Sequence, residues 1–274
     1  MNDQKPVVSV NIMGGLGNQM FQVATAYSYA KQQNGNLKIL PDRSNDDNRK
    51  HSNYWDTVLV NFKQYLVKTL PENMDRWCEK QATLYEPIPQ LPTAGMFLEG
   101  YYQSSKYFIK EEIKNLFRPE PTKLHDLGKK YENLIKNKDK VVVVHARRTD
   151  YLRDGGRFHG PLSVDYYKEA IREICKKIQN PIFLLTSDDS AYWPSVAKKI
   201  NAFQNNQYHI LNENEVNSLI LLQQFFHYII ANSTFSWWFV WLSEAKTVYA
   251  PKHWFGPAGF QNNEDIYEPD WIRI

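Results

Sequence analysis

Four consecutive valines, Val141 to Val144, limit what this chain can fold into more than any other feature of its sequence. A run of β-branched residues without a polar interruption is typical of a strand that is buried on both faces, as in a parallel sheet. In an open α/β sheet, ligands bind outside the carboxyl ends of the strands. The sequence therefore predicts that the residues after the valines lie where such a fold binds its ligand, and these are His145-Ala146-Arg147-Arg148-Thr149-Asp150.

Arg147 and Arg148 suit an anionic ligand in particular. A guanidinium donates paired hydrogen bonds to phosphate oxygens and stays charged at any working pH. We therefore predict that these arginines clamp a diphosphate. The alternative, which the residues alone leave open, is a surface cluster of salt bridges at a strand end.

After Lys140 the sequence alternates strand patterns with helix patterns, which indicates a parallel sheet with right-handed crossovers. Strands are predicted at Val141–Val144, Pro181–Leu185, Gln207–Leu211 and Thr247–Ala250. Helices are predicted at Ser163–Gln179, Ala191–Ile200, Glu215–Ile230 and Asn232–Glu244. The long apolar segment Glu215–Ile230 is interpreted as a buried helix.

The first half of the chain shows the same fold class less regularly. The patterns predict strands at Val7–Ile12, Leu37–Leu40 and Met96–Tyr102, and helices at 19–33, 105–117 and 125–137. Pro41–Ser52 is predicted to be a polar loop, and Tyr54–Pro92 to be irregular. The charged segment Lys136–Lys140 is typical of a domain seam. We therefore expect an α/β protein with two domains, residues 1–138 and 139–274.

A glycine-rich turn, Gly14-Gly15-Leu16-Gly17-Asn18-Gln19, joins the first strand to the first helix. Glycines there allow a backbone to approach a ligand, and a helix N-terminus favours anions. Asn18 and Gln19 carry amides suited to sugar hydroxyls. Gly15 and Gly17 form half of a dinucleotide fingerprint, because Met20 stands where a third glycine is expected. A plain tight turn explains the segment about as well.

Two further polar segments follow predicted strands. Ser187-Asp188-Asp189 offers carboxylates that can accept hydrogen bonds from ribose hydroxyls or guanine N–H groups; for Asp189, helix capping is an equal alternative. Adjacent carboxylates without further ligands are a weak metal signal. Thr234, Phe235 and Ser236 open a helix and form a second candidate phosphate seat, with an ordinary N-cap as the alternative.

Composition excludes several classes of function. The chain has 274 residues and a net charge of +3, which gives no sign of nucleic-acid binding. Its two cysteines, Cys78 and Cys175, lack metal-ligand spacing and are typical of reduced cytosolic thiols. No apolar signal segment opens the sequence, and its longest apolar run is too short to span a bilayer. We expect a cytoplasmic protein, with a peripheral position at the inner membrane face as an alternative.

Taken together, the segments resemble the family 11 glycosyltransferases, the α-1,2-fucosyltransferases. The matching segments occur in the family's order and cover most of the chain. They are Gly14–Gln22, Gly100–Ser104, His145–Tyr151, Ser187–Asp189 and Ile229–Trp238.

The resemblance implies a GT-B-like fold with two Rossmann-type halves, the donor GDP-β-L-fucose and inversion at the anomeric carbon. It implies no metal, and as acceptor the 2-hydroxyl of a galactose-terminated glycan. Carried over, Arg147 binds the β-phosphate, His145 and Asp188 contact ribose or guanine, and Thr234 to Trp237 hold the pyrophosphate. The N-terminal half would hold most of the acceptor site and the C-terminal half the nucleotide.

Some positions depart from the family pattern. The family usually has glycine where this chain has Thr149, and Gly-Ala where it has Phe239-Val240, which affects the expected shape of the acceptor site. Three rival hypotheses stay open: a glycosyltransferase with another nucleotide sugar, a non-catalytic glycan-binding protein, and an NAD-binding protein. The last would use Gly15-Leu16-Gly17 with Asp42, and the missing third glycine speaks against it.

The residue that accepts the acceptor's proton stays unassigned. Asp150 follows the arginines, and nearby cations lower the pKa and the basicity of a carboxylate. We therefore expect Asp150 to brace the guanidiniums rather than to act as a strong base. Glu99, Tyr101 and Tyr102 are the candidate acceptor contacts, although packing at a strand end explains the tyrosines as well.

Overall fold

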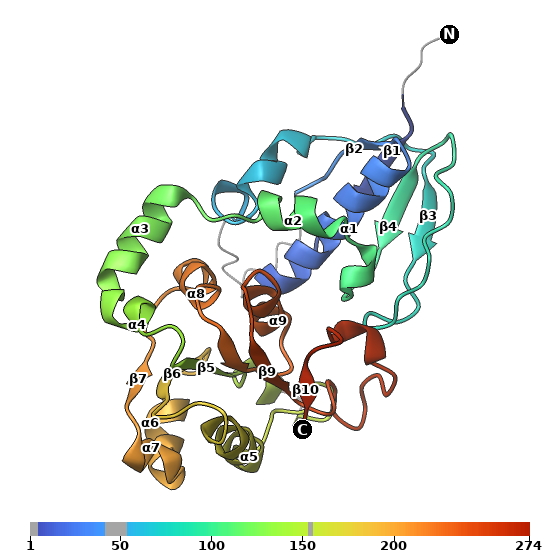
Figure 1. Cartoon of the computed structure of the whole chain (residues 1–274). Helices are drawn as coiled ribbons and strands as arrows, with labels where there is room; N and C mark the ends of the chain where they lie inside the picture. Colours follow the sequence, from blue (N-terminus) through green and yellow to red (C-terminus); the bar gives the residue numbers. More distant parts are fainter. Residues whose placement is uncertain (1–4, 42–53, 153–155) are drawn as a thin grey trace. The chain divides into compact units, whose positions relative to one another are not determined.

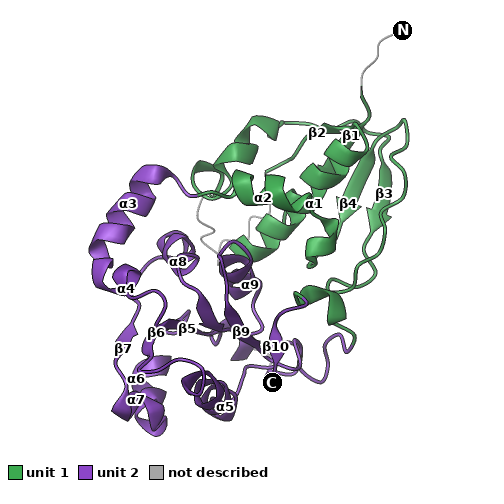
Figure 2. Cartoon of the chain, in the orientation of Figure 1, with its two compact units in different colours: residues 1–118, 262–268 green, residues 119–261, 269–274 purple. Residues whose placement is uncertain are grey.

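The computed structural model describes residues 5–41, 54–152 and 156–274. The chain forms two compact units (Figure 2): unit 1 comprises residues 1–118 and 262–268, and unit 2 comprises 119–261 and 269–274. The boundary thus falls before the expected seam at residues 138 and 139. The chain also enters unit 1 again near its end. Apart from Pro41, the predicted polar loop and Asp42 lie outside the described residues.

Unit 1 contains a parallel sheet, with four strands among the described residues in the order β2-β1-β4-β3. Its strands are β1 (Val7–Val10), β2 (Asn36–Leu37), β3 (Asp75–Cys78) and β4 (Met96–Glu99). Helix α1 (Leu16–Gln32) follows β1 (Figure 1) and buries Met20, Phe21 and Ala24, whereas Tyr27, at the same helical spacing, is partly exposed. Strand β2 is shorter than the predicted strand Leu37–Leu40 and begins one residue earlier. Ile39 makes only an isolated bridge to Leu66.

Most other elements of unit 1 are short. They are η1 (Tyr54–Asp56), η2 (Val60–Tyr65), η3 (Ser105–Tyr107), α2 (Lys110–Leu116) and η6 (Glu264–Ile266). Ser104 caps η3, because its Oγ accepts a hydrogen bond from the backbone N–H of Lys106 at 3.3 Å. Strand β3 was not predicted: Asp75-Arg76-Trp77-Cys78 is a largely exposed edge strand without apolar alternation.

Unit 2 contains a larger parallel sheet, in which the described residues form six strands in the order β10-β9-β8-β5-β6-β7. The strands are β5 (Val141–Ala146), β6 (Ile182–Ser187), β7 (Tyr208–Ile210), β8 (His227–Ile229), β9 (Thr247–Ala250) and β10 (Ile272–Arg273). The helical elements are α3 (Pro121–Lys130), α4 (Glu132–Lys136), η4 (Asp150–Leu152), α5 (Val164–Cys175), α6 (Tyr192–Val196), η5 (Ala197–Lys199), α7 (Ala202–Asn205), α8 (Glu215–Leu222) and α9 (Thr234–Trp241).

The valine strand β5 lies inside this sheet and is buried along its whole length, as predicted. Figure 1 shows α5 on one face of the sheet and α8 and α9 on the other. Successive side chains of a strand point to opposite faces. Val142 and Val144 pack in the core formed with α5 and α6. His145 therefore points to the face that α9 covers.

The predicted helix at Glu215–Ile230 is wrong in its second half. Helix α8 ends at Leu222, and His227 to Ile229 form strand β8, which pairs with β5 and β9. A short apolar run fits a buried helix and a buried strand equally well, so periodicity could not separate the two. His227 is accordingly a strand residue. No helix in the described ranges is long and apolar enough to cross a membrane.

Candidate functional site

Arg147 lies directly after β5 and forms a bidentate ion pair with Asp150. Its Nε donates to Oδ1 and its Nη2 to Oδ2, each at 2.9 Å. Asp188, which follows β6, lies 3.2 Å from the same Nε through Oδ2. The register pairs Ala146 with Ser187, so the ends of the two strands bring these groups together. The guanidinium is thereby fixed at the carboxyl edge of the sheet, 28% exposed.

Asp188 also fixes the loop that carries the arginines. Its Oδ1 accepts a hydrogen bond from the Arg148 N–H at 2.7 Å, and its Oδ2 accepts one from the Thr149 N–H at 3.1 Å. The Thr149 hydroxyl donates to Oδ2 as well. A carboxylate that accepts several backbone N–H bonds is strongly held. Asp188 therefore anchors the arginine loop. The ribose or guanine contact expected of it would be made in addition to these bonds.

Arg147 and Asp150 stabilise each other's charged form. Burial by itself lowers the pKa of Arg147, but the hydrogen bonds that it donates to Asp150 and the charges of Asp188 and Asp150 outweigh burial, and the pKa is raised. Burial by itself raises the pKa of Asp150, yet the hydrogen bond and charge of Arg147 bring that pKa below its usual value. A carboxylate in this state is a weak base, which matches the predicted brace.

The two arginines of the predicted clamp have different surroundings. Arg148 donates from Nη1 to the Leu162 carbonyl at 3.2 Å, and its guanidinium lies 4.7 Å from the centre of the Tyr192 ring. Its Nε is buried and has no hydrogen-bond partner among the described residues. Arg148 therefore contacts a backbone carbonyl and a tyrosine ring of the protein. Arg147 is instead held by two carboxylates at the carboxyl edge of the sheet.

His145 is buried at 3% exposure between aromatic rings of α9. The ring centres of Phe235 and Phe239 lie 5.7 and 5.9 Å away. Burial lowers the pKa of His145 to about 3, so the imidazole is neutral at physiological pH. Its Nδ1 is buried without a hydrogen-bond partner in the described structure. A direct ribose contact would need access that this packing does not provide.

The segment before α9 divides into accessible and structural residues. Thr234 and Phe235 are partly exposed. The Ser236 hydroxyl donates to the carbonyls of Ala231 and Ser233, both at 2.9 Å. Trp237 is fully buried. The expected contact of these last two side chains with a pyrophosphate therefore does not fit the structure, because burial commits them to the core.

Asp189 caps the turn before α6, which was the alternative to a ligand contact. Its Oδ1 accepts a hydrogen bond from the Ala191 N–H at 2.9 Å, while its own N–H donates to the Ser187 hydroxyl at 3.1 Å. These bonds form the turn before α6. They give Ser187 and Asp189 a structural role next to the site.

Sequence reasoning missed the contacts that hold Tyr151, whose ring centre lies 5.8 Å from the Arg147 guanidinium. His159 stacks on Tyr151 with ring centres 4.4 Å apart and an interplanar angle of 9°. The Tyr151 hydroxyl donates to the Asn232 carbonyl at 2.7 Å, and Asn232 Nδ2 donates to the carbonyl oxygens of His159 and Trp254 at 2.5 and 2.8 Å. No spacing in the sequence signals these contacts, since they join three distant segments.

In unit 1, the glycine-rich turn follows β1 and is closed by buried amides. Gly14 has a φ of +79°, which glycine adopts without strain. The Gln19 Nε2 donates to the Gly14 carbonyl at 2.9 Å, and Gln19 is 3% exposed. Gly17 is buried as well, whereas Gly15 is exposed and Asn18 partly exposed. Among the residues of this turn that we expect to contact the nucleotide-sugar donor, Gly15 and Asn18 are the ones that are accessible to such a ligand.

Sequence reasoning also did not select Glu79. It follows β3, and its Oε2 and Oε1 accept hydrogen bonds from the backbone N–H groups of Tyr101 and Tyr102 at 2.7 and 2.8 Å. Burial raises its pKa to about 7. Tyr102 is fully buried, with its ring stacked on Trp77 at 5.8 Å. The Tyr102 side chain, a predicted acceptor contact, is therefore committed to packing in this structure, whereas Tyr101 is partly exposed.

Glu99 ends β4 and is engaged with the neighbouring edge strand. It forms an ion pair with Arg76, and its Oε2 accepts a hydrogen bond from the Cys78 Sγ at 3.0 Å. The side chain is 31% exposed, so one face stays open to solvent.

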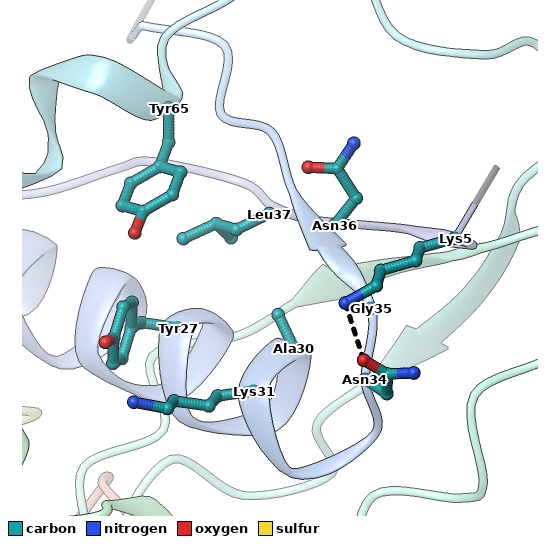
Figure 3. Close-up of a pocket in the computed structure, with 9 residues that line it drawn as sticks. All are labelled: Lys5, Tyr27, Ala30, Lys31, Asn34, Gly35, Asn36, Leu37 and Tyr65. Atoms are coloured by element: carbon teal, nitrogen blue, oxygen red, sulfur yellow. Dashed lines mark hydrogen bonds between the residues drawn. The ribbon is translucent and has the colours of Figure 1, made fainter.

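A surface pocket of about 460 Å³ lies elsewhere on unit 1 (Figure 3). Tyr27, Lys31, Leu37 and Tyr65 line it, and Lys5 donates to Asn34 Oδ1 at 2.6 Å across one side. It lies beside Gly35 and Asn36, where β2 begins, whereas parallel α/β folds bind ligands at the carboxyl ends of strands. This pocket is therefore separate from the candidate site.

An α/β fold with a braced arginine at a strand end is the kind of structure that binds an anionic ligand at the edge of its sheet. This chain belongs to glycosyl transferase family 11, whose model matches residues 1–274. It is 27% identical to an alpha-1,2-colitosyltransferase of Escherichia coli, over 98% of this chain and 99% of the relative. It is 24% identical to galactoside 2-alpha-L-fucosyltransferase SEC1 of Bos taurus, over 98% of this chain and 74% of the relative.

Solved structures of fucosyltransferases share the fold. A crystal structure of POFUT1 in complex with GDP matches with a TM-score of 0.54 and 14% identity, over 94% of this chain and 98% of that one. The fucosyltransferase NodZ from Bradyrhizobium matches with a TM-score of 0.54 and 13% identity, over 88% and 94%. The expected GT-B-like α/β fold is thereby confirmed.

Proposed function

We propose that this glycosyltransferase moves L-fucose from GDP-β-L-fucose to the 2-hydroxyl of a terminal galactoside and forms an α-1,2 linkage with inversion. The observation that carries the proposal is the guanidinium of Arg147, fixed by Asp150 and Asp188 at the carboxyl end of β5. Relatives named as galactoside 2-alpha-L-fucosyltransferases support the choice of donor, acceptor and linkage.

Arg147 would act on the leaving group. When the bond to the sugar breaks, negative charge develops on the β-phosphate, and a preorganised cation there lowers the barrier. The pair with Asp150 uses Nε and Nη2. Nη1 donates to no described residue and is the nitrogen we assign to the phosphate. The brace holds the cation before the reaction, so little reorganisation is needed when charge appears.

The other residues would complete the two substrate sites. The first turn of α9, with Thr234 and Phe235, would lie near the pyrophosphate, because a helix N-terminus favours anions. Tyr101 and Glu99 of unit 1 are the side chains we assign to the galactoside. A sugar hydroxyl can attack directly in an inverting displacement, and the group that accepts its proton stays unassigned.

A donor screen tests the proposal. The protein is incubated with a β-galactoside and GDP-fucose, GDP-mannose or UDP-galactose, and the linkage of the product is determined by NMR. We expect transfer from GDP-fucose to O2 of galactose. Product from another donor would contradict the proposal. Glycan binding without turnover of any donor would instead indicate a non-catalytic glycan-binding protein.

A second candidate is transfer of colitose. The observation in its favour is the colitosyltransferase of Escherichia coli, which matches nearly the whole length of both chains. A colitosyl donor is therefore included in the screen. A higher kcat/KM with that donor than with GDP-fucose would replace fucose by colitose in the proposal and leave the family unchanged.

A further inference from the structure

Unit 1 contains a half-buried carboxylate, Glu79, between an edge strand and a loop. Cys78 at the end of β3 pairs with Glu99 at the end of β4, and the Glu79 N–H continues the ladder to the Glu99 carbonyl at 2.8 Å. This register places the Glu79 side chain against the residue after β4, which is Gly100.

Gly100 is the residue that makes this contact possible. A Cβ at position 100 would lie 2.5 Å from the Cβ of Glu79 and 2.6 Å from its Oε2. Real Cβ contacts are not that short, so any larger residue would displace the carboxylate. Each carboxylate oxygen then accepts one backbone N–H, from Tyr101 at 2.7 Å and from Tyr102 at 2.8 Å.

The clamped loop contains an uncommon backbone conformation. Tyr102 has a φ of +54°, in the left-handed region that is uncommon for a residue with a side chain. Its ring is held between Trp77 and Tyr107, with ring centres 5.8 and 5.4 Å away. The two hydrogen bonds of Glu79 and this aromatic packing together maintain the turn.

The same loop is connected to the glycine-rich turn. The Gln22 Nε2 donates to the Gly100 carbonyl at 3.2 Å, and its Oε1 accepts from the Met13 N–H at 3.0 Å. The Gln103 Nε2 donates to Asn18 Oδ1 at 3.1 Å. The two loops therefore form one hydrogen-bonded surface at the carboxyl ends of β1 and β4, and Tyr101 and Asn18 are its accessible side chains.

We propose that Glu79 is a positioning residue for the acceptor: by clamping two backbone N–H groups of the loop, it holds Tyr101 in the position that binds the galactoside. This inference rests on the proposed function of the site. It adds a residue that contacts neither substrate and acts through the loop.

The clamp depends on ionisation. A carboxylate offers an acceptor to both N–H groups, whereas a protonated carboxyl turns one oxygen into a hydroxyl donor. Burial raises the pKa of Glu79 to about 7, against the hydrogen bonds of Tyr101 and Tyr102, which lower it. Glu86 adds its negative charge nearby, and the phenols of Tyr102 and Tyr107 face the same carboxylate. The KM for the acceptor should accordingly rise as the pH falls through about 7.

The test compares Glu79→Gln with Glu112→Gln. Glutamine keeps the size of the side chain but offers an acceptor to only one N–H. Glu112 is a carboxylate of the same unit that binds Lys31 and Tyr27. We expect Glu79→Gln to raise the acceptor KM by at least tenfold, to abolish its pH dependence near 7 and to leave the GDP Kd within twofold. Glu112→Gln should match the natural protein in all three.

Two results would overturn the inference: an acceptor KM and pH profile that Glu79→Gln leaves unchanged, or a parallel loss of GDP affinity. Amide NMR separates this failure from that of the proposed function. In the natural protein the Tyr101 and Tyr102 amide signals should titrate together near pH 7, and in Glu79→Gln they should not. If neither protein transfers fucose, the proposed function fails, and amides that do not titrate still refute the clamp.

Discussion

Arg147 and Asp150 face each other as a bidentate pair, with both N–O distances at 2.9 Å, only three residues apart at the end of β5. A planar guanidinium and a carboxylate match in this fork geometry, which fixes orientation as well as charge. Both carboxylate oxygens of Asp150 are therefore engaged by the arginine.

Asp150→Asn should weaken donor binding together with turnover. The amide cannot accept from both guanidinium nitrogens, and loss of a hydrogen bond to a charged group costs about 1.5–3 kcal/mol. Binding of GDP-fucose by calorimetry and single-turnover rates check this outcome. A donor affinity that stays intact while turnover falls by about 10²–10⁴-fold would instead identify Asp150 as a general base.

Arg147→Ala should weaken GDP binding by about 2–5 kcal/mol, because it leaves a desolvated phosphate without its cation. Arg147→Lys keeps a charge but loses the fork, so it should restore the affinity only in part. Arg172→Ala is the control, since Arg172 is an exposed arginine of α5. Calorimetry that finds the same GDP affinity in Arg147→Ala and Arg172→Ala would refute the phosphate contact.

Asp188→Asn should lower the denaturation midpoint, whereas Asp189→Asn should not. Asp188 accepts N–H bonds with both oxygens, and an amide there would turn its NH₂ group towards one donor, at a cost of about 1–3 kcal/mol. The contact from Asp189 Oδ1 to the Ala191 N–H survives in asparagine, which keeps that acceptor. Urea unfolding of both variants checks the contrast; equal midpoints would show that the Asp188 contacts add little stability.

Transfer should continue in the presence of a chelator. Within the described residues, no group of three or more His, Cys, Asp or Glu side chains is placed to hold a metal ion. In the proposal, Arg147 and the N-terminus of α9 neutralise the diphosphate instead. Product formation with excess EDTA measures this. Loss of activity that magnesium or manganese restores would contradict it.

Glu79 should make the protein less stable as the pH rises towards 7. Its pKa is about 7 in the folded protein and near 4.3 in an unfolded chain, so the unfolded state ionises first. Its contribution to the free energy of unfolding is present below about pH 4 and is lost as the pH rises through 7. Allowing for partial exposure, the change is on the order of 2 kcal/mol.

Urea unfolding of Glu79→Gln against the natural protein between pH 4.5 and 8 tests this prediction. The difference between the two proteins isolates Glu79 from the other titrating groups. A difference that does not vary with pH would show that the carboxyl titrates normally.

The sequence by itself determined the fold class and the edge of the sheet where the candidate site lies. β-Branched residues favour extended backbone locally, so the four valines predict a buried strand without any knowledge of the strands that pair with it. Strands that alternate with helices then lead to parallel pairing. Hence the positions of Arg147, Asp188 and the glycine-rich turn at strand ends followed from local patterns.

Only the tertiary structure decided which partner each polar group has. Strand register placed Ser187 beside Ala146 and so brought Asp188 to the arginine loop; register also placed Glu79 against Gly100. Pairing between distant strands leaves no local periodicity in the sequence. The same holds for β8, an apolar run that became a strand because β5 and β9 flank it. Burial, hydrogen bonding and the pKa of a carboxyl group depend on such neighbours, and these exist only once the chain has folded.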